Sequence, residues 1–217
     1  MSTAGLKLCP KVILEGTRLT LKTEIAFALN EHPRIVGPRR YRYHSPLVSA
    51  EWCGFTPFPW GRGAINYAPE ETARAMATFD AWARLFELLP WYSWIVDRFH
   101  LSTRVWQRSH GRPDPEFGWL EDRLRPLGFH LVLCVRRPET FAAARAERLK
   151  VSGNPAQYDH LDVFLREQEM FRSLAGESRL PRLELDVGDA GVEGAVERIA
   201  DWLESTGGLW GRSEVVP

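Results

Sequence analysis

Short apolar segments alternate with longer amphipathic segments along almost the whole chain. The runs Lys11–Glu15, Ser93–Val96 and Phe129–Val135 are apolar and contain β-branched residues, which predicts buried strands. Between them lie stretches with helical spacing, such as Pro69–Leu89, which begins with a proline and two glutamates. This alternation is typical of a parallel sheet with helices on both faces. We therefore predict an α/β fold with a five-stranded, mostly parallel central sheet, and place these three runs near its centre.

The other elements follow from the same patterns. Two more strands are expected at Arg34–Tyr43 and Leu183–Val187. Ser45–Tyr67 is rich in Pro, Gly and aromatic residues, and is predicted to be irregular and partly buried. The remaining helices are predicted over Lys22–Leu29, from Leu101 onward, and over Glu116–Leu127, Pro138–Lys150, Gln157–Leu174 and Val192–Glu204. Because no repeat or linker interrupts the pattern, we expect a single domain over residues 1–217.

Charge and cysteine content narrow the functional classes. The chain has 28 Lys and Arg and 28 Asp and Glu residues, so no broad basic surface is expected for a nucleic-acid partner. No run of about 18 apolar residues occurs, which argues against a membrane partner, and the N-terminus lacks the apolar core of a signal peptide. The cysteines are far apart and lack metal-binding spacing, which fits a reducing compartment. We therefore expect a cytoplasmic protein.

A candidate phosphate-binding loop joins the first predicted strand to the first predicted helix. The segment Gly16–Thr23 reads GTRLTLKT, close to the pattern GxxxxGK[ST], but Leu21 stands where the second glycine belongs. Loop N–H groups and the helix start would cradle phosphates, while Lys22 neutralises their charge and Thr23 binds Mg²⁺. The candidate nucleotide-binding residues are Gly16, Thr17, Thr20, Leu21, Lys22 and Thr23. The alternative is an ordinary strand–turn–helix with a solvated lysine.

Asp97 and Arg98 follow directly after a predicted buried strand. Ligands of open α/β sheets bind at the carboxyl ends of the strands, where both side chains are expected to lie. Asp97 could help to hold Mg²⁺ or accept a proton from an attacking hydroxyl, and Arg98 could hold an acceptor or a phosphoryl group. The alternative is a salt bridge at the strand end.

At these motifs the sequence resembles a known family. The segments VILEG followed by KT, then IVDRFHLS, then HLVLCVRRPETFAAARAER are similar to the thymidylate-kinase and deoxynucleoside-kinase group, over roughly residues 11–204. The resemblance implies a three-layer P-loop NTPase fold, ATP and Mg²⁺ as cofactors, and phosphoryl transfer to a nucleoside, a nucleotide or a similar small-molecule acceptor. Because members of the group are often dimeric, it also implies a homodimer. Leu21 departs from the group's phosphate-binding loop.

The resemblance also assigns roles outside the loop. In these kinases lid arginines close over the phosphates, which implies that role for Arg145 and Arg148 in a lid region at about residues 138–158; a solvated helix face is the alternative. Glu51 stands where related nucleoside kinases carry an acidic residue, and is an alternative general base. Trp52 could stack on the acceptor, although the core is favoured for most of the neighbouring aromatics. The candidate catalytic residues are Lys22, Asp97, Arg98, Arg145 and Arg148, and the candidate acceptor-binding residues are Glu51, Trp52 and Arg98.

Two other functions stay open at this point. One is sulfotransfer from a nucleotide sulfate, because Arg136 to Thr140 loosely resembles the second phosphate-binding stretch of sulfotransferases. The other is a nucleotide-binding protein without catalysis, which Leu21 favours because its side chain could crowd the phosphates.

Overall fold

The central sheet has five parallel strands in the order β2-β3-β1-β4-β5. The computed structural model describes residues 6–37, 47–59 and 61–211. The strands are β1 (Lys11–Glu15), β2 (Leu47–Val48), β3 (Trp94–Asp97), β4 (Phe129–Val135) and β5 (Arg182–Asp186). Ile13 in the middle strand lies opposite Val96 on one side and Leu131 on the other. The prediction that β1, β3 and β4 are the buried centre of a parallel sheet is therefore confirmed.

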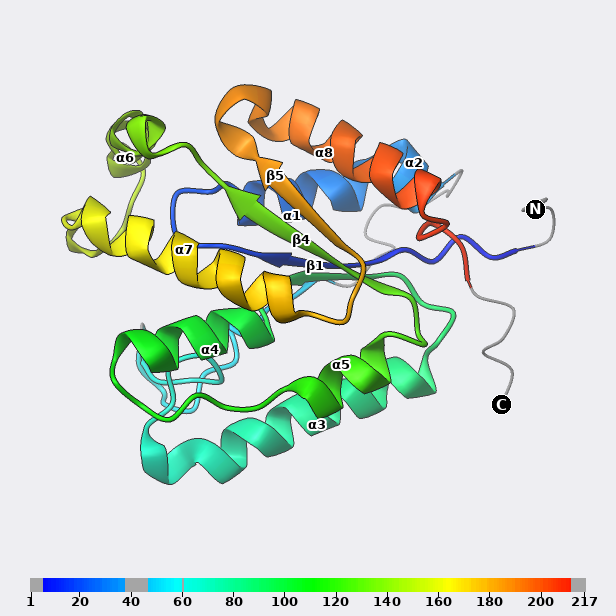
Figure 1. The fold of residues 1–217 in the computed structure, drawn as a ribbon, viewed down its shortest axis with the longest axis horizontal. Helices are drawn as coiled ribbons and strands as arrows, with labels where there is room; N and C mark the ends of the chain where they lie inside the picture. The colour runs from blue at the N-terminus through cyan, green and yellow to red at the C-terminus, as the bar shows by residue number, and fades with distance from the viewer. Residues whose placement is uncertain (1–5, 38–46, 60, 212–217) are drawn as a thin grey trace.

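Helices cover both faces of the sheet, giving three layers (Figure 1). One face carries α1 (Lys22–Glu31), α2 (Pro33–Val36) and α8 (Val187–Ser205), and the other carries α3 (Thr72–Leu88), α4 (His100–Ser109), α5 (Gly118–Leu124) and α7 (Leu161–Glu177). α6 (Phe141–Leu149) stands beyond the end of β4, between the short 3₁₀ turns Pro138–Thr140 and Pro155–Tyr158, and a third such turn, Pro69–Glu71, precedes α3. Among the described residues, no helix is both long and apolar enough to cross a bilayer.

The side chains of β1 alternate between two hydrophobic cores, one on each face of the sheet. Ile13 points into a cluster rich in aromatics on the α3 side, which we call the aromatic core, together with Phe79, Phe99 and Phe117. Val12 and Leu14 point to the opposite face, into an aliphatic core formed with α1 and α8. Because successive residues of a strand face opposite sides, one buried strand closes both cores at once.

The second strand does not lie at Arg34–Tyr43, where the sequence predicts it. Of Arg34–Tyr43, the residues up to Val36 form α2, and residues 38–46 lie outside the described part of the chain. Pro33 at the first helical position favours a helix start there, since its fixed φ suits a helix. The strand that completes the sheet is instead Leu47–Val48, inside the segment Ser45–Tyr67 that was predicted to be irregular.

Replacing Phe79 by alanine tests the aromatic core. The Phe79 ring is fully buried and makes edge-on contacts with Trp82, Phe99 and Phe117, with centroids 5.6, 5.1 and 4.7 Å away. We expect Phe79→Ala to lower the free energy of unfolding by about 3–5 kcal/mol in urea denaturation. Phe58→Ala is the control, because Phe58 is 73% exposed; a loss of similar size there would contradict the assignment of the core.

Candidate active site

Gly16 opens the loop at the end of β1 and cannot be replaced by a larger residue. Its φ is +141°, a conformation that side chains disfavour, and a Cβ atom there would come within 2.3 Å of the Cys134 carbonyl oxygen. The loop thus leaves the sheet in close contact with the end of β4. Close approach of backbone to backbone is what this glycine provides.

Two leucines of the loop adopt the left-handed conformation in which glycine is usual. Leu19 has a φ of 67° and Leu21 a φ of 56°, and such a conformation costs about 1–2 kcal/mol for a residue with a side chain. Leu21 packs against the aliphatic core, and Leu19 packs against a small cluster of Phe141, Tyr158 and Phe164. The loop therefore takes the turn that the missing glycine would allow, and apolar contacts hold it there.

Lys22 is buried at the start of α1, and only 4% of it is exposed. Its ammonium group donates hydrogen bonds to the Thr17 carbonyl and to Thr20 Oγ1, so it is enclosed by the loop. Burial, together with the positive charge of Arg98, lowers the Lys22 pKa to about 8. The alternative of a solvated lysine is therefore wrong.

Thr23 and Asp97 meet across the sheet edge. Thr23 Oγ1 donates a 2.6 Å hydrogen bond to Asp97 Oδ2. Among the residues that the structure describes, Asp97 Oδ1 is buried without a hydrogen-bond partner. A buried carboxylate oxygen without a partner is costly, and hard cations such as Mg²⁺ prefer oxygen ligands of this kind. The two predicted magnesium ligands thus lie together and fit that ion.

Arg98 is held between the loop and Glu51. Its φ is 62°, its Nε lies 2.9 Å from the Glu51 carboxylate, and it donates to the Gly16 carbonyl at 3.3 Å. The Arg98 charge lowers the pKa of Glu51, against the opposing effect of burial. Glu51 therefore lies in the predicted site, but its pairing with Arg98 weakens it as a proton acceptor.

Both lid arginines donate a hydrogen bond to Tyr158, and they differ in their other contacts. Arg145 Nε donates to the Tyr158 carbonyl at 2.7 Å, so it ties the lid region to itself. Arg148 lies 3.2 Å from Glu24 of α1, directly after Thr23. The structure thus brings Arg148 to the start of α1, while Arg145 stays within the lid.

The predicted aromatic residues divide between the core and the surface. Trp94 is buried, as expected for most of the group. Trp52 and Phe58 are mostly exposed, at 57% and 73%, so they are not part of the core that was expected for most of these aromatics. Trp52 follows Glu51 directly and is free to contact a ligand.

Several residues that shape the site are not among the candidate site residues predicted from the sequence. Glu15, the last residue of β1, is fully buried and accepts hydrogen bonds from the start of α4. Glu167 of α7 accepts a 2.5 Å hydrogen bond from Thr17, and Arg136 donates to the Leu19 carbonyl at 2.9 Å. Gln168 binds both the N–H and the carbonyl of Arg136. The usable signal is Glu15, a charged residue at the carboxyl end of a strand whose centre is apolar.

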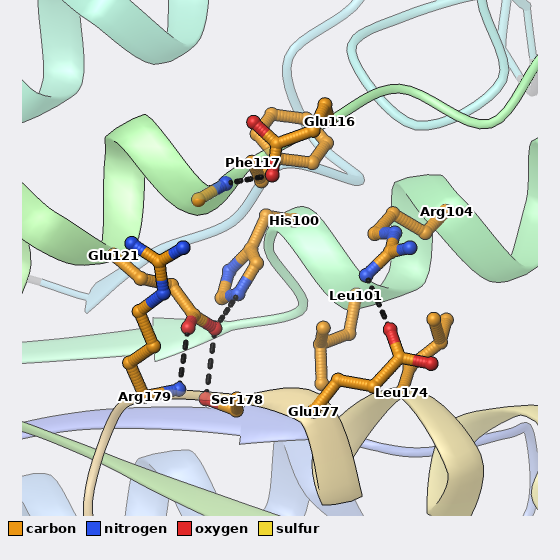
Figure 2. Close-up of a pocket in the computed structure, with 11 residues that line it drawn as sticks. His100, Leu101, Arg104, Glu116, Phe117, Glu121, Leu174, Glu177, Ser178 and Arg179 are labelled. Carbon is orange, nitrogen blue, oxygen red and sulfur yellow. Dashed lines mark hydrogen bonds and ion pairs between the residues drawn. The ribbon is translucent and has the colours of Figure 1, made fainter.

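A cavity of about 130 Å³ lies apart from these residues, between α4, α5 and α7 (Figure 2). At its wall, Glu121 accepts hydrogen bonds from His100 Nε2, Ser178 Oγ and the Arg179 N–H, at 2.9, 2.8 and 2.7 Å. These contacts satisfy the Glu121 carboxylate and hold its pKa at about 2, although burial alone would raise it. None of the predicted site residues lines this cavity.

Comparison with known proteins finds similarity in structure alone. No protein-family model and no curated protein matches the chain. The crystal structure of YorR from Bacillus subtilis, in complex with phosphorylated GDP, is similar at a TM-score of 0.60 and 15% identity, over 90% of this chain and 96% of YorR. Thymidylate kinase from Candida albicans matches at a TM-score of 0.49 and 14% identity, over 93% of each chain, a likeness too weak to carry an argument.

Structural similarity at this low sequence identity shows a shared fold, but it does not show a shared activity. The predicted architecture is confirmed: one parallel five-stranded sheet lies between two layers of helices, and a chain of the same fold covers nearly its whole length. The protein shares the three-layer α/β fold of YorR, and its sequence motifs resemble those of the P-loop kinases.

Proposed function

We propose that this protein is an ATP-dependent kinase that transfers a phosphoryl group to a nucleoside, a nucleotide or a similar small-molecule hydroxyl acceptor. The observation that carries the proposal is the pairing of Thr23 with Asp97, which leaves a buried carboxylate oxygen of Asp97 unpaired among the described residues. The charge of Asp97 also acts on the enclosed Lys22 ammonium and raises its pKa against the larger effect of burial. A lysine and an acidic oxygen gathered at the start of a helix are suited to a magnesium-bound phosphate group.

The nucleotide phosphates would occupy the loop Gly16–Thr23. The first turn of α1 presents free N–H groups there, and Lys22 supplies the positive charge. Lys22 now satisfies its ammonium with Thr17 and Thr20. An incoming phosphate would replace these neutral partners by an anion, which is a stronger partner for a desolvated lysine.

Thr23 and Asp97 are the residues that would hold Mg²⁺. The ion supplies neutralisation of the charge that develops on the transferring phosphoryl oxygens. Asp97 could instead accept the proton of the acceptor hydroxyl, and Glu51 is the other candidate for that role. Because Glu51 is paired with Arg98, it would have to leave that ion pair in order to act as a base.

The acceptor side is formed by Glu51, Trp52 and Arg98. Arg98 would hold the acceptor or the transferring group, and the exposed Trp52 ring offers a face for a planar acceptor. Arg145 and Arg148 would close from the lid, and for Arg148 this means exchanging Glu24 for a phosphate. Since YorR was solved with a phosphorylated guanosine nucleotide, nucleotides are the first acceptors to test.

A nucleotide-binding protein without turnover is the second candidate. It is favoured by Leu21, which occupies the sequence position where the phosphate-binding pattern has its second glycine. Isothermal titration with ATP and with a nucleotide sulfate, followed by a turnover assay, separates both candidates from a sulfotransferase.

The first prediction concerns Lys22. We expect Lys22→Ala to lower the rate of phosphoryl transfer by several orders of magnitude, since it removes the charge directed at the transferring group. Transfer from radiolabelled ATP to a panel of nucleosides and nucleotides measures the effect. The exposed Lys7 is the matched control; Lys7→Ala should keep the wild-type rate. An unchanged rate in Lys22→Ala would contradict the assigned loop.

The second prediction concerns pH. In the folded protein the Lys22 pKa is lowered from 10.5 to about 8. Between about pH 8 and 10.5 the unfolded chain therefore binds this proton more than the folded protein does, and the free energy of unfolding rises with pH. Phosphate binding favours the charged form. We therefore expect ATP affinity to fall by up to about tenfold per pH unit above pH 8. Titration calorimetry of wild type against Lys22→Arg, which stays charged, provides the test; parallel profiles would refute it.

The third prediction concerns Leu21. Glycine at this position would remove the backbone strain of the positive φ, about 1–2 kcal/mol. It would also lose the stabilisation from the partly buried Leu21 side chain, which is of about the same size. We expect Leu21→Gly to change the free energy of unfolding by less than about 1 kcal/mol, and not to tighten ATP binding, because the backbone already has the required turn.

Leu19→Gly is the matched control, because Leu19 has the same left-handed backbone and packs on a different cluster. Markedly tighter ATP binding in Leu21→Gly alone, together with a wild type that shows no turnover, would favour the non-catalytic binder.

A further inference from the structure

Glu15 is a buried carboxylate whose hydrogen bonds to the described residues all reach one short segment. Oε1 accepts from the backbone N–H groups of Phe99, Leu101 and Ser102, at 3.0, 2.9 and 3.2 Å. Oε2 accepts from the N–H and the hydroxyl of Ser102, at 3.2 and 2.5 Å. A carboxylate taken out of water is costly unless it is fully hydrogen-bonded, and this one is.

These contacts form a helix cap supplied by a distant strand. The N-cap residue of α4, Phe99, makes no side-chain capping bond, so the first N–H groups of the helix depend on Glu15. The negative charge also lies at the positive end of the α4 dipole. Glu15 therefore fixes the start of α4 against the end of β1.

The capped segment directly follows Asp97 and Arg98. Arg98 has the disfavoured positive φ of 62°, its N–H donates to the Leu14 carbonyl at 2.9 Å, and its own carbonyl accepts from Ala50 at 3.1 Å. The backbone on both sides of this turn is thus tied to β1, through Leu14 before it and Glu15 after it. Glu15 is also the residue directly before Gly16, where the phosphate-binding loop begins.

We propose that Glu15 is a positioning residue: its carboxylate sets the Asp97–Arg98 turn relative to the phosphate-binding loop, and so sets the magnesium dependence of nucleotide binding. The proposal rests on the function proposed above. Thr23 and Asp97 face each other from these two segments, so a shift of the turn would separate the two oxygen ligands while leaving Lys22 in place.

The same helix offers a matched control on its other side. Glu121 is also buried and accepts three hydrogen bonds, one of them from His100, the first residue of α4 (Figure 2). Its side-chain partners among the described residues are His100, Ser178 and Arg179, which belong to neither the loop nor the turn. Glu121 lies on α5, so Glu121→Gln removes an equivalent buried charge that contacts the same helix α4 without touching the candidate site.

The experiment compares Glu15→Gln with Glu121→Gln. In Glu15→Gln an amide NH₂ would face the Ser102 donors, and the negative charge at the helix start would be lost. We expect both variants to lower the melting temperature. Calorimetry should show that the tightening of ATP binding by Mg²⁺ falls about tenfold or more in Glu15→Gln, and stays at the wild-type value in Glu121→Gln. Equal magnesium dependence in the two variants would overturn the proposal.

Amide hydrogen exchange of the nucleotide-free proteins gives an independent measurement. Glu15→Gln should speed the exchange of residues 98–102 more than Glu121→Gln does; equal rates would overturn the positioning role. If wild-type protein binds no ATP with or without Mg²⁺, the proposed function fails, whereas the exchange result still decides whether Glu15 holds the turn.

Ser102→Ala keeps the proposal testable if Glu15→Gln does not fold. It removes only the 2.5 Å hydroxyl contact with Glu15 Oε2 and leaves the backbone donors in place. We expect a smaller loss of magnesium dependence in the same direction. A Ser102→Ala protein with wild-type magnesium dependence and wild-type exchange at residues 98–102 would overturn the proposal.

Discussion

The position of β1 is the constraint on which the rest of the structure depends. It pairs with a parallel strand on each side, and all five of its residues are buried. Its side chains close two separate cores, so neither face can change without affecting the other. Since all strands run the same way, the chain leaving β1 emerges between the ends of β3 and β4, and the loop at Gly16 is surrounded by backbone from both.

Opposite charges gather at this crowded strand end in nearly equal number. Lys22 and Arg98 bring positive charge, and Asp97, Glu51 and Glu15 bring negative charge. Burial opposes the charges of Lys22 and Arg98, and mutual attraction offsets the cost only where partners are close. Arg98 shows the balance, because burial lowers its pKa while Glu51 and Asp97 raise it further than burial lowers it. A cluster like this fixes geometry more than it adds stability.

Local patterns were enough to predict the frame of the molecule. Phe129–Val135 is apolar except for His130 and is bounded by glycine and arginine, and it is a strand with those bounds. The spacing of Gly16, Lys22 and Thr23 located the loop, because it depends on neighbours in the sequence. The prediction of a strand at Arg34–Tyr43 was wrong for the opposite reason. No hydrophobic alternation marks the second strand, and Leu47–Val48 is a strand only because β3 lies beside it. The contacts of Glu15 reach residues 84 or more positions away, so they follow from strand order and not from any local pattern.

The two left-handed leucines give the phosphate-binding loop a thermodynamic character of its own. A glycine-rich loop is free to sample many shapes when empty, and binding must then remove that freedom. Here Leu19 and Leu21 fasten the loop to two different apolar clusters, and Glu167 and Arg136 hold it from α7 and the end of β4. Most of the conformational entropy of the loop is therefore lost when the protein folds, and little is left to lose on binding. A phosphate that enters such a loop meets a rigid receptor, and its affinity depends on the fit and charge of that receptor.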